Sequence, residues 1–547
     1  MNPGDSPDPF SVSTPAESRN LVLTGFMGTG KTRIGREVAR RLGRPFVDMD
    51  VEIESRAGKP IPSIFAEDGE AAFRRMEADL CRELSSRTGH VIATGGGALI
   101  DPANREAMMR GGIVVCLTSD PVEIQRRLRE GDNPVRPLLD VVDQRAEIAR
   151  LLAARQDAYA AIPWQIETTA SPVEEVAERV IQLADVATLR VAHPGGEYPI
   201  YLGEGLLSHV GGALRASGAI RGSRVAVVSN PVVAPLYGEQ LRSALHAAGY
   251  RPVVCTIPDG EDHKTLDTVA GLYDQFLDGR LDRSSGVVSL GGGVTGDIAG
   301  FAAATFMRGV PFVQVPTTLL SMVDASVGGK VGVDLPQGKN LAGAFKQPAL
   351  VMIDPGVLVT LPAEEMRSGM AEAIKHGVIG APDLFAELES PSPGARSWVS
   401  VLQLKRALEV KIQVVEADPF EQGRRAVLNL GHTVGHALER LSDFSLRHGE
   451  AVAIGMVAAA RISAELGRAE PSLPGRIEGA LLAWGLPVRC PPLGAGEIWE
   501  AMGHDKKRRG RSLRWVLPHA IGQVEVADVV PREVVSSVVT GMGARSE

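Results

Sequence analysis

The sequence has 547 residues, of which 44% are hydrophobic and 23% are charged, and its net charge is −8. This length exceeds one hydrophobic core, so several compact units of about 100–200 residues each are expected. The negative net charge argues against general nucleic-acid binding, which needs a broad basic surface. No apolar run reaches the ~20 residues that cross a bilayer. We therefore expect a soluble multidomain protein without nucleic-acid or membrane partners.

The cysteines and the first residues bear on the compartment. Cys81, Cys116, Cys255 and Cys490 are far apart and form no C-x-x-C pair, which fits a reducing compartment without a disulfide framework. Residues 1–19 have neither the basic start nor the apolar stretch of a signal peptide. We expect a disordered tail and a cytoplasmic protein.

From residue 20 onward, apolar strand-like runs alternate with amphipathic helical stretches. RNLVLTGF predicts a strand that enters a glycine turn, and TRIGREVARRLG predicts a helix that ends at Gly43. VIATGGG and GIVVCLT predict further buried strands. Such alternation is typical of parallel α/β layers.

A second block begins near residue 187. TLRVAHPGGEYPIYLGEGLL is rich in strand and hairpin signals, and RVAVVSN, PVVCTIPDG and GVVSLGGGVTGD predict the strands of another α/β layer. From about residue 360, long helical patterns such as EEMRSGMAEAIKHGVI replace the strands. We predict an α/β unit over 20–187, an α/β domain over 188–359 and a helical domain over 360–547.

The segment GFMGTGKT at 25–32 matches G-x-x-x-x-G-K-[ST] between a predicted strand and a predicted helix. Gly28 and Gly30 let backbone N–H groups surround phosphate oxygens at a helix N-terminus. Lys31 would reach the β- and γ-phosphates, and Thr32 would offer its hydroxyl to Mg²⁺. An accidental lysine in a glycine turn is the alternative, which the strand–loop–helix context disfavours. The pattern predicts a site for ATP with Mg²⁺.

The residues around this loop resemble the shikimate kinase family over roughly residues 20–185. The resemblance rests on DMD, IPSIFAEDGEAAFRRMEADL, VIATGGGAL, VRPLL and an arginine that precedes a tyrosine in RQDAY. It implies that shikimate is phosphorylated, with fork-shaped cations on its carboxylate and an acceptor on its hydroxyls. It assigns shikimate binding to Asp50, Arg74, Gly96 and Arg155, nucleotide contacts to Arg129 and Arg136, and a metal contact to Asp48. The alternative is another P-loop kinase of a small metabolite.

The second block carries VVSLGGGVTGDIAGF, which has a strand and three glycines but not G-x-G-x-x-G, so it could be a structural turn. Together with PDGEDHKT, PTTLLSMVDASVGGK and GKNLAGAFKQP, it resembles the 3-dehydroquinate synthase family over about residues 188–540. The resemblance implies a Rossmann-like NAD domain followed by a helical metal-binding domain. It assigns NAD contacts to Asn230, Glu261, Lys264, Gly292, Gly293, Asp297, Thr317, Thr318 and Thr360.

A group of potential metal ligands lies in the helical part. Glu372 is in MAEAIKHG, His432 and His436 are in LNLGHTVGHALE, and His448 is in LRHGEAVAIGM. The spacing of four places His432 and His436 on one helix face, and histidines of a satisfied core are the alternative. The resemblance implies that Glu372, His432 and His448 bind Zn²⁺ or Co²⁺, with His436 on the substrate. Three protein ligands leave the open position of a catalytic zinc.

The resemblance also implies the substrate, 3-deoxy-D-arabino-heptulosonate 7-phosphate, whose phosphate and carboxylate need several cations. The candidate cations are Lys330, Lys339, Lys375, Lys411, Arg425 and one lysine of the pair Lys506 and Lys507, of which the resemblance favours Lys506. Asp324, Asn340, Asn429 and His436 would serve hydroxyls and proton transfers. Val331, Asp334 and Lys346 stand where the family usually has Thr, Asn and Tyr.

The implied reaction is redox-neutral. NAD⁺ oxidises a ring hydroxyl at the metal, phosphate leaves, the ketone is reduced again, and an aldol closure gives 3-dehydroquinate. The alternatives are a metal-dependent polyol dehydrogenase, which would release NADH, and a regulator with a structural metal, which would usually have four protein ligands. We expect a homodimer formed through the synthase part.

Overall fold

The computed structural model describes residues 19–130, 143–390, 399–443, 445–509 and 514–546. The chain divides into two compact units, of which the first comprises Met1–Ala187 with Ser208–Ala219 and the second comprises Thr188–Leu207 with Ile220–Glu547. Each unit has its own hydrophobic core. The segment 208–219, which the sequence analysis places in the second part, groups with the first unit because its helix α9 (Val210–Ser217) contacts strand β5 (Trp164–Glu167).

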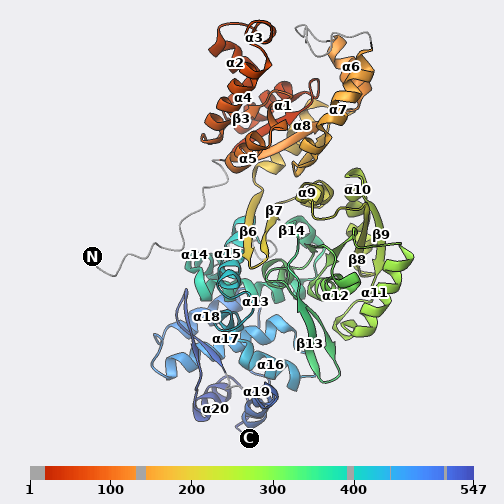
Figure 1. Cartoon of the computed structure of the whole chain (residues 1–547). Helices are drawn as coiled ribbons and strands as arrows, with labels where there is room; N and C mark the ends of the chain where they lie inside the picture. The colour runs from red at the N-terminus through yellow and green to blue at the C-terminus, as the bar shows by residue number, and fades with distance from the viewer. Residues whose placement is uncertain (1–18, 131–142, 391–398, 444, 510–513, 547) are drawn as a thin grey trace. The chain divides into compact units, whose positions relative to one another are not determined.

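The first unit is a parallel sheet with helices around it (Figure 1), as the alternating pattern predicts. The strand order is β2-β3-β1-β4-β5, and neighbouring strands run parallel. With β5, the strands are β1 (Asn20–Gly25), β2 (Phe46–Asp48), β3 (Val91–Ala93) and β4 (Gly112–Thr118). The helices are α1 (Lys31–Leu42), α2 (Met49–Ala57), α3 (Ile61–Glu67), α4 (Glu70–Ser85), α5 (Pro102–Gly111), α6 (Pro121–Glu130), α7 (Gln144–Ala160) and α8 (Val173–Ala184). The predicted end of α1 at Gly43 is confirmed, since this glycine caps the helix with φ 64°.

The second unit begins with another α/β sheet, whose strand order is β6-β7-β14-β11-β10-β8-β9. From β7 to β9 along this order, neighbouring strands run parallel. The strands are β6 (Ala187–His193), β7 (Gly196–Leu202), β8 (Arg224–Ser229), β9 (Arg251–Thr256), β10 (Gly286–Gly291), β11 (Phe312–Pro316) and β14 (Leu350–Ile353). An antiparallel hairpin, β12 (Lys330–Leu335) with β13 (Gly338–Phe345), is inserted before β14. The helices of this part are α10 (Glu239–Ala247), α11 (Leu266–Asp278) and α12 (Gly293–Thr305).

The rest of the second unit is mainly helical (Figure 1), as predicted. Its helices are α13 (Ala363–Gly380), α14 (Pro382–Glu389), α15 (Val401–Ala417), α16 (His432–Leu441), α17 (His448–Glu465), α18 (Leu473–Ala483), α19 (Ala495–Arg509) and α20 (Arg532–Gly541). It also contains a hairpin that the sequence analysis missed, β15 (Trp515–Ala520) with β16 (Gln523–Ala527), whose strands are too short for a clear alternation. Along the described parts of the chain, no helix combines the length and the apolar character that crossing a bilayer requires.

Candidate active sites

The glycine-rich loop between β1 and α1 wraps around its lysine. Gly28 and Gly30 have φ values of 79° and 94°, a region that glycine enters without steric cost. The ammonium of Lys31 donates to the carbonyl oxygens of Gly25 and Phe26 at 2.9 and 3.0 Å. The loop therefore holds a cation at the N-terminus of α1, an arrangement suited to phosphate oxygens.

A hydroxyl and a carboxylate meet beside this loop. Thr32 Oγ1 donates to Asp48 Oδ2 at 2.7 Å, and Asp48 Oδ1 accepts the backbone N–H of Asp50 at 3.1 Å and so caps α2. These are oxygen ligands of the kind that Mg²⁺ takes together with the phosphates of a nucleotide. The pair fits the metal contacts predicted for Thr32 and Asp48.

The glycine turn after β3 lies against the predicted shikimate residues. A Cβ atom at Gly95 would lie 2.7 Å from Glu77 Oε1 and 2.8 Å from Asp50 Oδ1, and one at Gly97 would lie 2.7 Å from Arg74 Nη1. Arg74 also pairs with Glu77 at 2.5 Å. Only glycine lets the backbone approach these charged groups so closely, and the turn brings Asp50 and Arg74 together.

Arg155 completes this group from α7. Its guanidinium donates to the carbonyl oxygen of Gly96 at 3.1 Å and lies 5.1 Å from the ring centre of Phe26. Tyr159, one turn further along α7, donates to the same carbonyl at 2.8 Å. Arg155 is 7% exposed, so a carboxylate at this turn would meet an oriented and largely desolvated cation.

In the second unit, the glycine turn after β10 leads into α12. A Cβ atom at Gly292 would lie 3.0 Å from Thr318 Cγ2, and Gly293 begins the helix. The hydroxyl of the neighbouring Thr317 is buried and has no hydrogen-bond partner within the described residues. A helix N-terminus beside an unpaired buried hydroxyl fits the phosphates and hydroxyls of a dinucleotide.

Lys264 is a buried lysine that joins two predicted sites. Its ammonium lies 2.7 Å from Asp297 Oδ2 and donates to Asn340 Oδ1 at 2.6 Å. Burial raises the pKa of Asp297 to about 6, although Lys264 opposes the rise. Asn340 has φ 54°, and its N–H donates to Asp334 Oδ1 at 2.6 Å. Asp334, which stands where the family usually has Asn, thus stabilises the backbone of Asn340 through this hydrogen bond.

Two other residues of the predicted NAD set have different partners. Asn230 Nδ2 donates to Asp259 at 2.6 Å, and the Thr360 hydroxyl lies 2.7 Å from the hydroxyl of Tyr237. Within the described residues, neither is hydrogen-bonded to the group around Lys264.

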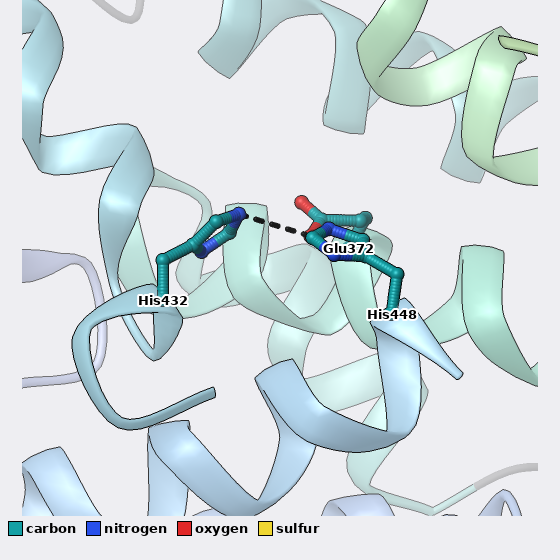
Figure 2. A group of neighbouring side chains, drawn as sticks. All are labelled: Glu372, His432 and His448. Atoms are coloured by element: carbon teal, nitrogen blue, oxygen red, sulfur yellow. Dashed lines mark ion pairs between the residues drawn. The ribbon is translucent and has the colours of Figure 1, made fainter. Parts of the chain in front are cut away.

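The predicted metal ligands lie together. Glu372 comes from α13, and His432 and His448 begin α16 and α17 (Figure 2). The Nε2 atoms of the two histidines lie 3.8 and 3.6 Å from Glu372 Oε1. Four ligands in tetrahedral positions about 2.1 Å from a zinc ion would lie about 3.4 Å apart. The observed distances therefore come within a few tenths of an ångström of a zinc site.

The polar atoms of this group are arranged so that a cation can bind between them. Both carboxylate oxygens of Glu372 are buried without a hydrogen-bond partner within the described residues, although Lys375 forms an ion pair with this carboxylate. His432 Nδ1 lies 3.1 Å from the carbonyl oxygen of Leu430, so Nδ1–H donates there and the Nε2 lone pair faces Glu372. An unsatisfied buried carboxylate and an oriented imidazole fit a bound metal.

The pKa values of Glu372 and His432 agree with this assignment, whereas that of His448 describes the ring in the metal-free chain. Burial would raise the pKa of Glu372, but Lys375 and His448 hold it below the ordinary value. Burial lowers the pKa of His432 well below its ordinary value, which keeps the imidazole neutral, the form that binds metals. Burial also opposes the charge of His448, but Glu372 and Glu439 outweigh it and raise the pKa to about 10. Without a metal ion the two carboxylates therefore favour a positive charge at His448, and a cation bound at Nε2 would displace the proton there.

Asp324 and Lys411 form an ion pair in the same region. Lys411 Nζ lies 2.5 Å from Asp324 Oδ1 and the His376 ring lies 3.9 Å from the same oxygen. Burial would raise the pKa of Asp324, but Lys411 and then Lys375 hold it well below the ordinary value. The arrangement offers an ionised acceptor beside two ammonium groups, as an anionic polyol requires.

Other predicted substrate residues are anchored separately. Arg425 is 2% exposed and donates to the Gly328 carbonyl oxygen at 3.2 and 3.3 Å. Lys330 pairs with Glu421 at 2.6 Å and is half-exposed, and Asn429 ends the short helix η11 (Arg424–Asn429). Lys339 lies 3.7 Å from Glu261, and Arg129 lies on α6. Lys506 and Lys507 belong to α19, but the structure does not describe their side chains, and Arg136 lies outside the described residues.

The sequence analysis missed several polar residues at these sites, among them His376, Glu439 and Arg127, as well as the buried Glu77 beside Arg74. His376 is fully buried, and neither ring nitrogen has a hydrogen-bond partner within the described residues. Glu439 pairs with His448 of the metal group and with the neighbouring His436, and Arg127 donates to the carbonyl oxygen of Gly28 in the glycine loop at 3.4 Å. His376 and Glu439 stand inside KHG and GHALE, where their motif position was visible, whereas nothing in the sequence marked Arg127.

These folds and sites define a chain with two enzyme centres, a P-loop kinase and an α/β enzyme with a histidine–carboxylate metal group. The shikimate kinase model matches residues 27–185, and the models for the N-terminal and C-terminal parts of 3-dehydroquinate synthase match residues 254–368 and 369–508. The chain belongs to the 3-dehydroquinate synthase family and carries a shikimate kinase domain before it. Both resemblances seen in the sequence are confirmed.

Individual proteins agree with this assignment. The 3-dehydroquinate synthase of Microcystis aeruginosa is 48% identical over 359 residues, which cover 64% of this chain and 97% of the relative. That of Pelotomaculum thermopropionicum is 48% identical over 338 residues, which cover 60% and 90%. Among solved structures, 2-epi-5-epi-valiolone synthase from Streptomyces hygroscopicus, with NAD⁺ and Zn²⁺ bound, is 29% identical with a TM-score of 0.58 and covers 65% of this chain and 98% of its own.

Proposed function

We propose that the first unit phosphorylates shikimate with ATP and Mg²⁺. We propose that the second converts 3-deoxy-D-arabino-heptulosonate 7-phosphate to 3-dehydroquinate and phosphate with NAD⁺ and with Zn²⁺ or Co²⁺. The observation that carries the second assignment is the buried Glu372 carboxylate faced by His432 and His448. The structure of valiolone synthase solved with NAD⁺ and Zn²⁺ supports the choice of cofactors.

In the kinase unit, Asp50 accepts a hydroxyl of shikimate and orients it for attack, while Arg74 and Arg155 bind its carboxylate. This division of roles follows from charge, because the turn at Gly95–Gly97 brings the carboxylates of Asp50 and Glu77 together with two guanidinium groups, and Glu77 is already paired with Arg74. Lys31 offsets the charge that develops on the transferred phosphoryl group.

In the synthase unit, bound NAD⁺ supplies hydride transfer and the bound metal polarises the reacting oxygen. Lys264, Asp297 and Thr317 hold the cofactor. Lys375 and Lys411 bind the anionic groups of the substrate beside the metal ligands. The ionised Asp324 accepts hydrogen bonds from hydroxyls of the substrate. His436 transfers protons, and its ring centre lies 5.1 Å from that of His432.

We further propose that the protein is cytoplasmic and forms a homodimer through the synthase unit. The four cysteines are buried and unpaired, which supports a reducing compartment. Phe345 and Phe420 form an edge-to-face pair although about half of each is exposed (48% and 51%), which supports an apolar contact surface. Sedimentation at several protein concentrations tests the dimer.

Phosphate release from the heptulosonate phosphate tests the synthase assignment. With NAD⁺ far below the substrate concentration, we expect many phosphates per NAD⁺, no accumulation of NADH absorbance, and loss of activity on chelation. Accumulation of NADH in proportion to substrate would instead favour the polyol dehydrogenase. Formation of ADP that depends on shikimate tests the kinase, and equal rates with unrelated polyols would contradict it.

A further inference from the structure

Glu439 lies between His448, a proposed metal ligand, and His436, which is proposed to contact the substrate. It stands on α16, three residues after His436, and is 7% exposed. Its Oε1 lies 3.4 Å from His448 Nδ1 and its Oε2 lies 3.9 Å from His436 Nε2. A carboxylate is costly to bury unless it is paired or hydrogen-bonded, so these two imidazoles account for its presence inside the helical domain.

The ring of His448 faces a different carboxylate on each side. Its Nε2 lies 3.6 Å from Glu372 Oε1, and its Nδ1 lies 3.4 Å from Glu439 Oε1. If Nδ1 carries the hydrogen and donates it to Glu439, the lone pair of Nε2 is directed at the space beside Glu372. His432 has the same arrangement, with the carbonyl oxygen of Leu430 as the acceptor of its Nδ1–H.

The two histidines therefore differ in what holds them. A backbone carbonyl orients His432, whereas an ionisable side chain orients His448. Metal-binding histidines generally donate their other N–H to such an acceptor, which sets the tautomer, fixes the ring and raises the basicity of the ligand. A carboxylate does this more strongly than a neutral carbonyl, because the hydrogen bond is charge-assisted.

We propose that Glu439 is a positioning residue of the metal site: it accepts the Nδ1–H of His448 and so directs Nε2 at the metal. This inference rests on the proposed metal set of Glu372, His432 and His448. His436, Glu439 and His448 also lie close enough together to hold an ion. We assign Glu439 a positioning role and not a ligand role, because its Oε1 is engaged by His448 whereas both oxygens of Glu372 lack a hydrogen-bond partner within the described residues.

The affinity of the full-length chain for Zn²⁺, measured by competition with a chelator, tests this role. We expect Glu439→Gln, which keeps the size of the side chain, to weaken binding about tenfold, and Glu439→Ala to weaken it roughly 10- to 100-fold, with the stoichiometry unchanged. His432→Ala should remove the site. Glu478→Gln is the matched control, since Glu478 pairs with Arg461 at 2.8 Å in the same domain and should bind Zn²⁺ as the unchanged chain does.

The thermal unfolding temperature in excess chelator separates positioning from folding. We expect Glu439→Gln to unfold there as the unchanged chain does and to gain less stability from Zn²⁺. Unchanged Zn²⁺ affinity in both Glu439 variants would overturn the proposal, as would a loss as complete as that of His432→Ala, which would make Glu439 a ligand. If Glu439→Gln unfolded at a lower temperature than the unchanged chain in excess chelator but bound Zn²⁺ with normal affinity, Glu439 would have a packing role instead. If His432→Ala bound Zn²⁺ normally, the proposed metal site itself would fail.

Discussion

The ammonium of Lys264 lies 2.6 Å from the side-chain oxygen of Asn340. The same ammonium lies 2.7 Å from Asp297. One buried cation thus connects Asp297, which belongs to the proposed NAD⁺ site, with Asn340, which belongs to the proposed substrate site. The sequence separates Lys264 and Asn340 by 76 positions, and the hairpin β12–β13 brings them together.

This contact predicts a double effect of Lys264→Ala. A hydrogen bond to a charged group contributes about 1.5–3 kcal/mol, so loss of the ammonium should weaken NAD⁺ binding and raise KM for the heptulosonate phosphate, each by roughly 10- to 100-fold. NAD⁺ titration and steady-state kinetics measure the two effects. Lys405→Ala, an exchange at a lysine beside Glu409 on α15, is the control and should change neither. An unaltered KM for the substrate would disprove the connection.

The pKa of Asp297, about 6 because of burial, predicts that NAD⁺ binding depends on pH. Below about pH 6 the carboxyl holds its proton. Above that pH it is charged and becomes a stronger acceptor for a ribose hydroxyl. NAD⁺ affinity should therefore rise between about pH 5 and 7 and then level off, as measured by calorimetric titration across this range. In Asp297→Asn, affinity should be lower and flat over the same range, and a variant that kept the rise would assign the titration to another group.

Gly97→Ala should impair shikimate binding. The added Cβ would lie 2.7 Å from Arg74 Nη1, closer than real contacts, so the guanidinium must leave its place at the turn. We expect KM for shikimate to rise about tenfold or more, because a charge-assisted pair is misplaced. KM for ATP serves as the internal control, since the nucleotide loop between β1 and α1 is a separate turn. A rise confined to KM for ATP would refute the assignment of Arg74.

Chelation should remove synthase activity and leave the fold of the kinase unit intact. The synthase metal would have three protein ligands, whereas Mg²⁺ reaches the kinase with its nucleotide and is held by few protein groups. After chelation and dialysis, Mg²⁺ alone should restore only shikimate phosphorylation, and Zn²⁺ or Co²⁺ should restore phosphate release. Rescue of both activities by Mg²⁺ alone would contradict the assignment of the metal group.

The two activities should respond independently to mutation. Lys31→Ala removes the charge at the phosphates and should slow shikimate phosphorylation on the order of a hundredfold or more, while phosphate release stays nearly unchanged. His432→Ala should do the reverse. The residues share no partner, so the double mutant should combine the two losses without a further term. A loss of about tenfold in synthase turnover from Lys31→Ala would require coupled sites.

Much of this architecture could be predicted from the sequence. The glycine loop with Lys31 and Thr32, the parallel strands, and the helices that carry Glu372, His432 and His448 all depend on local patterns: hydrophobic periodicity, glycines at turns and residues in motifs. Such patterns act over a few residues, so they are visible without tertiary contacts.

Only the tertiary structure determines which partners the buried polar groups have. Glu439 and His376 stand in helices where either could have faced solvent, and only packing buries them beside His448 and Asp324. The joint contacts of Lys264 and the bond between Asn340 and Asp334 arise when a distant hairpin folds back. Local sequence determines which side chain a helix or turn presents. Contacts between residues far apart in the chain determine which group that side chain meets in the desolvated interior, and this partner sets the charge and the orientation of the side chain.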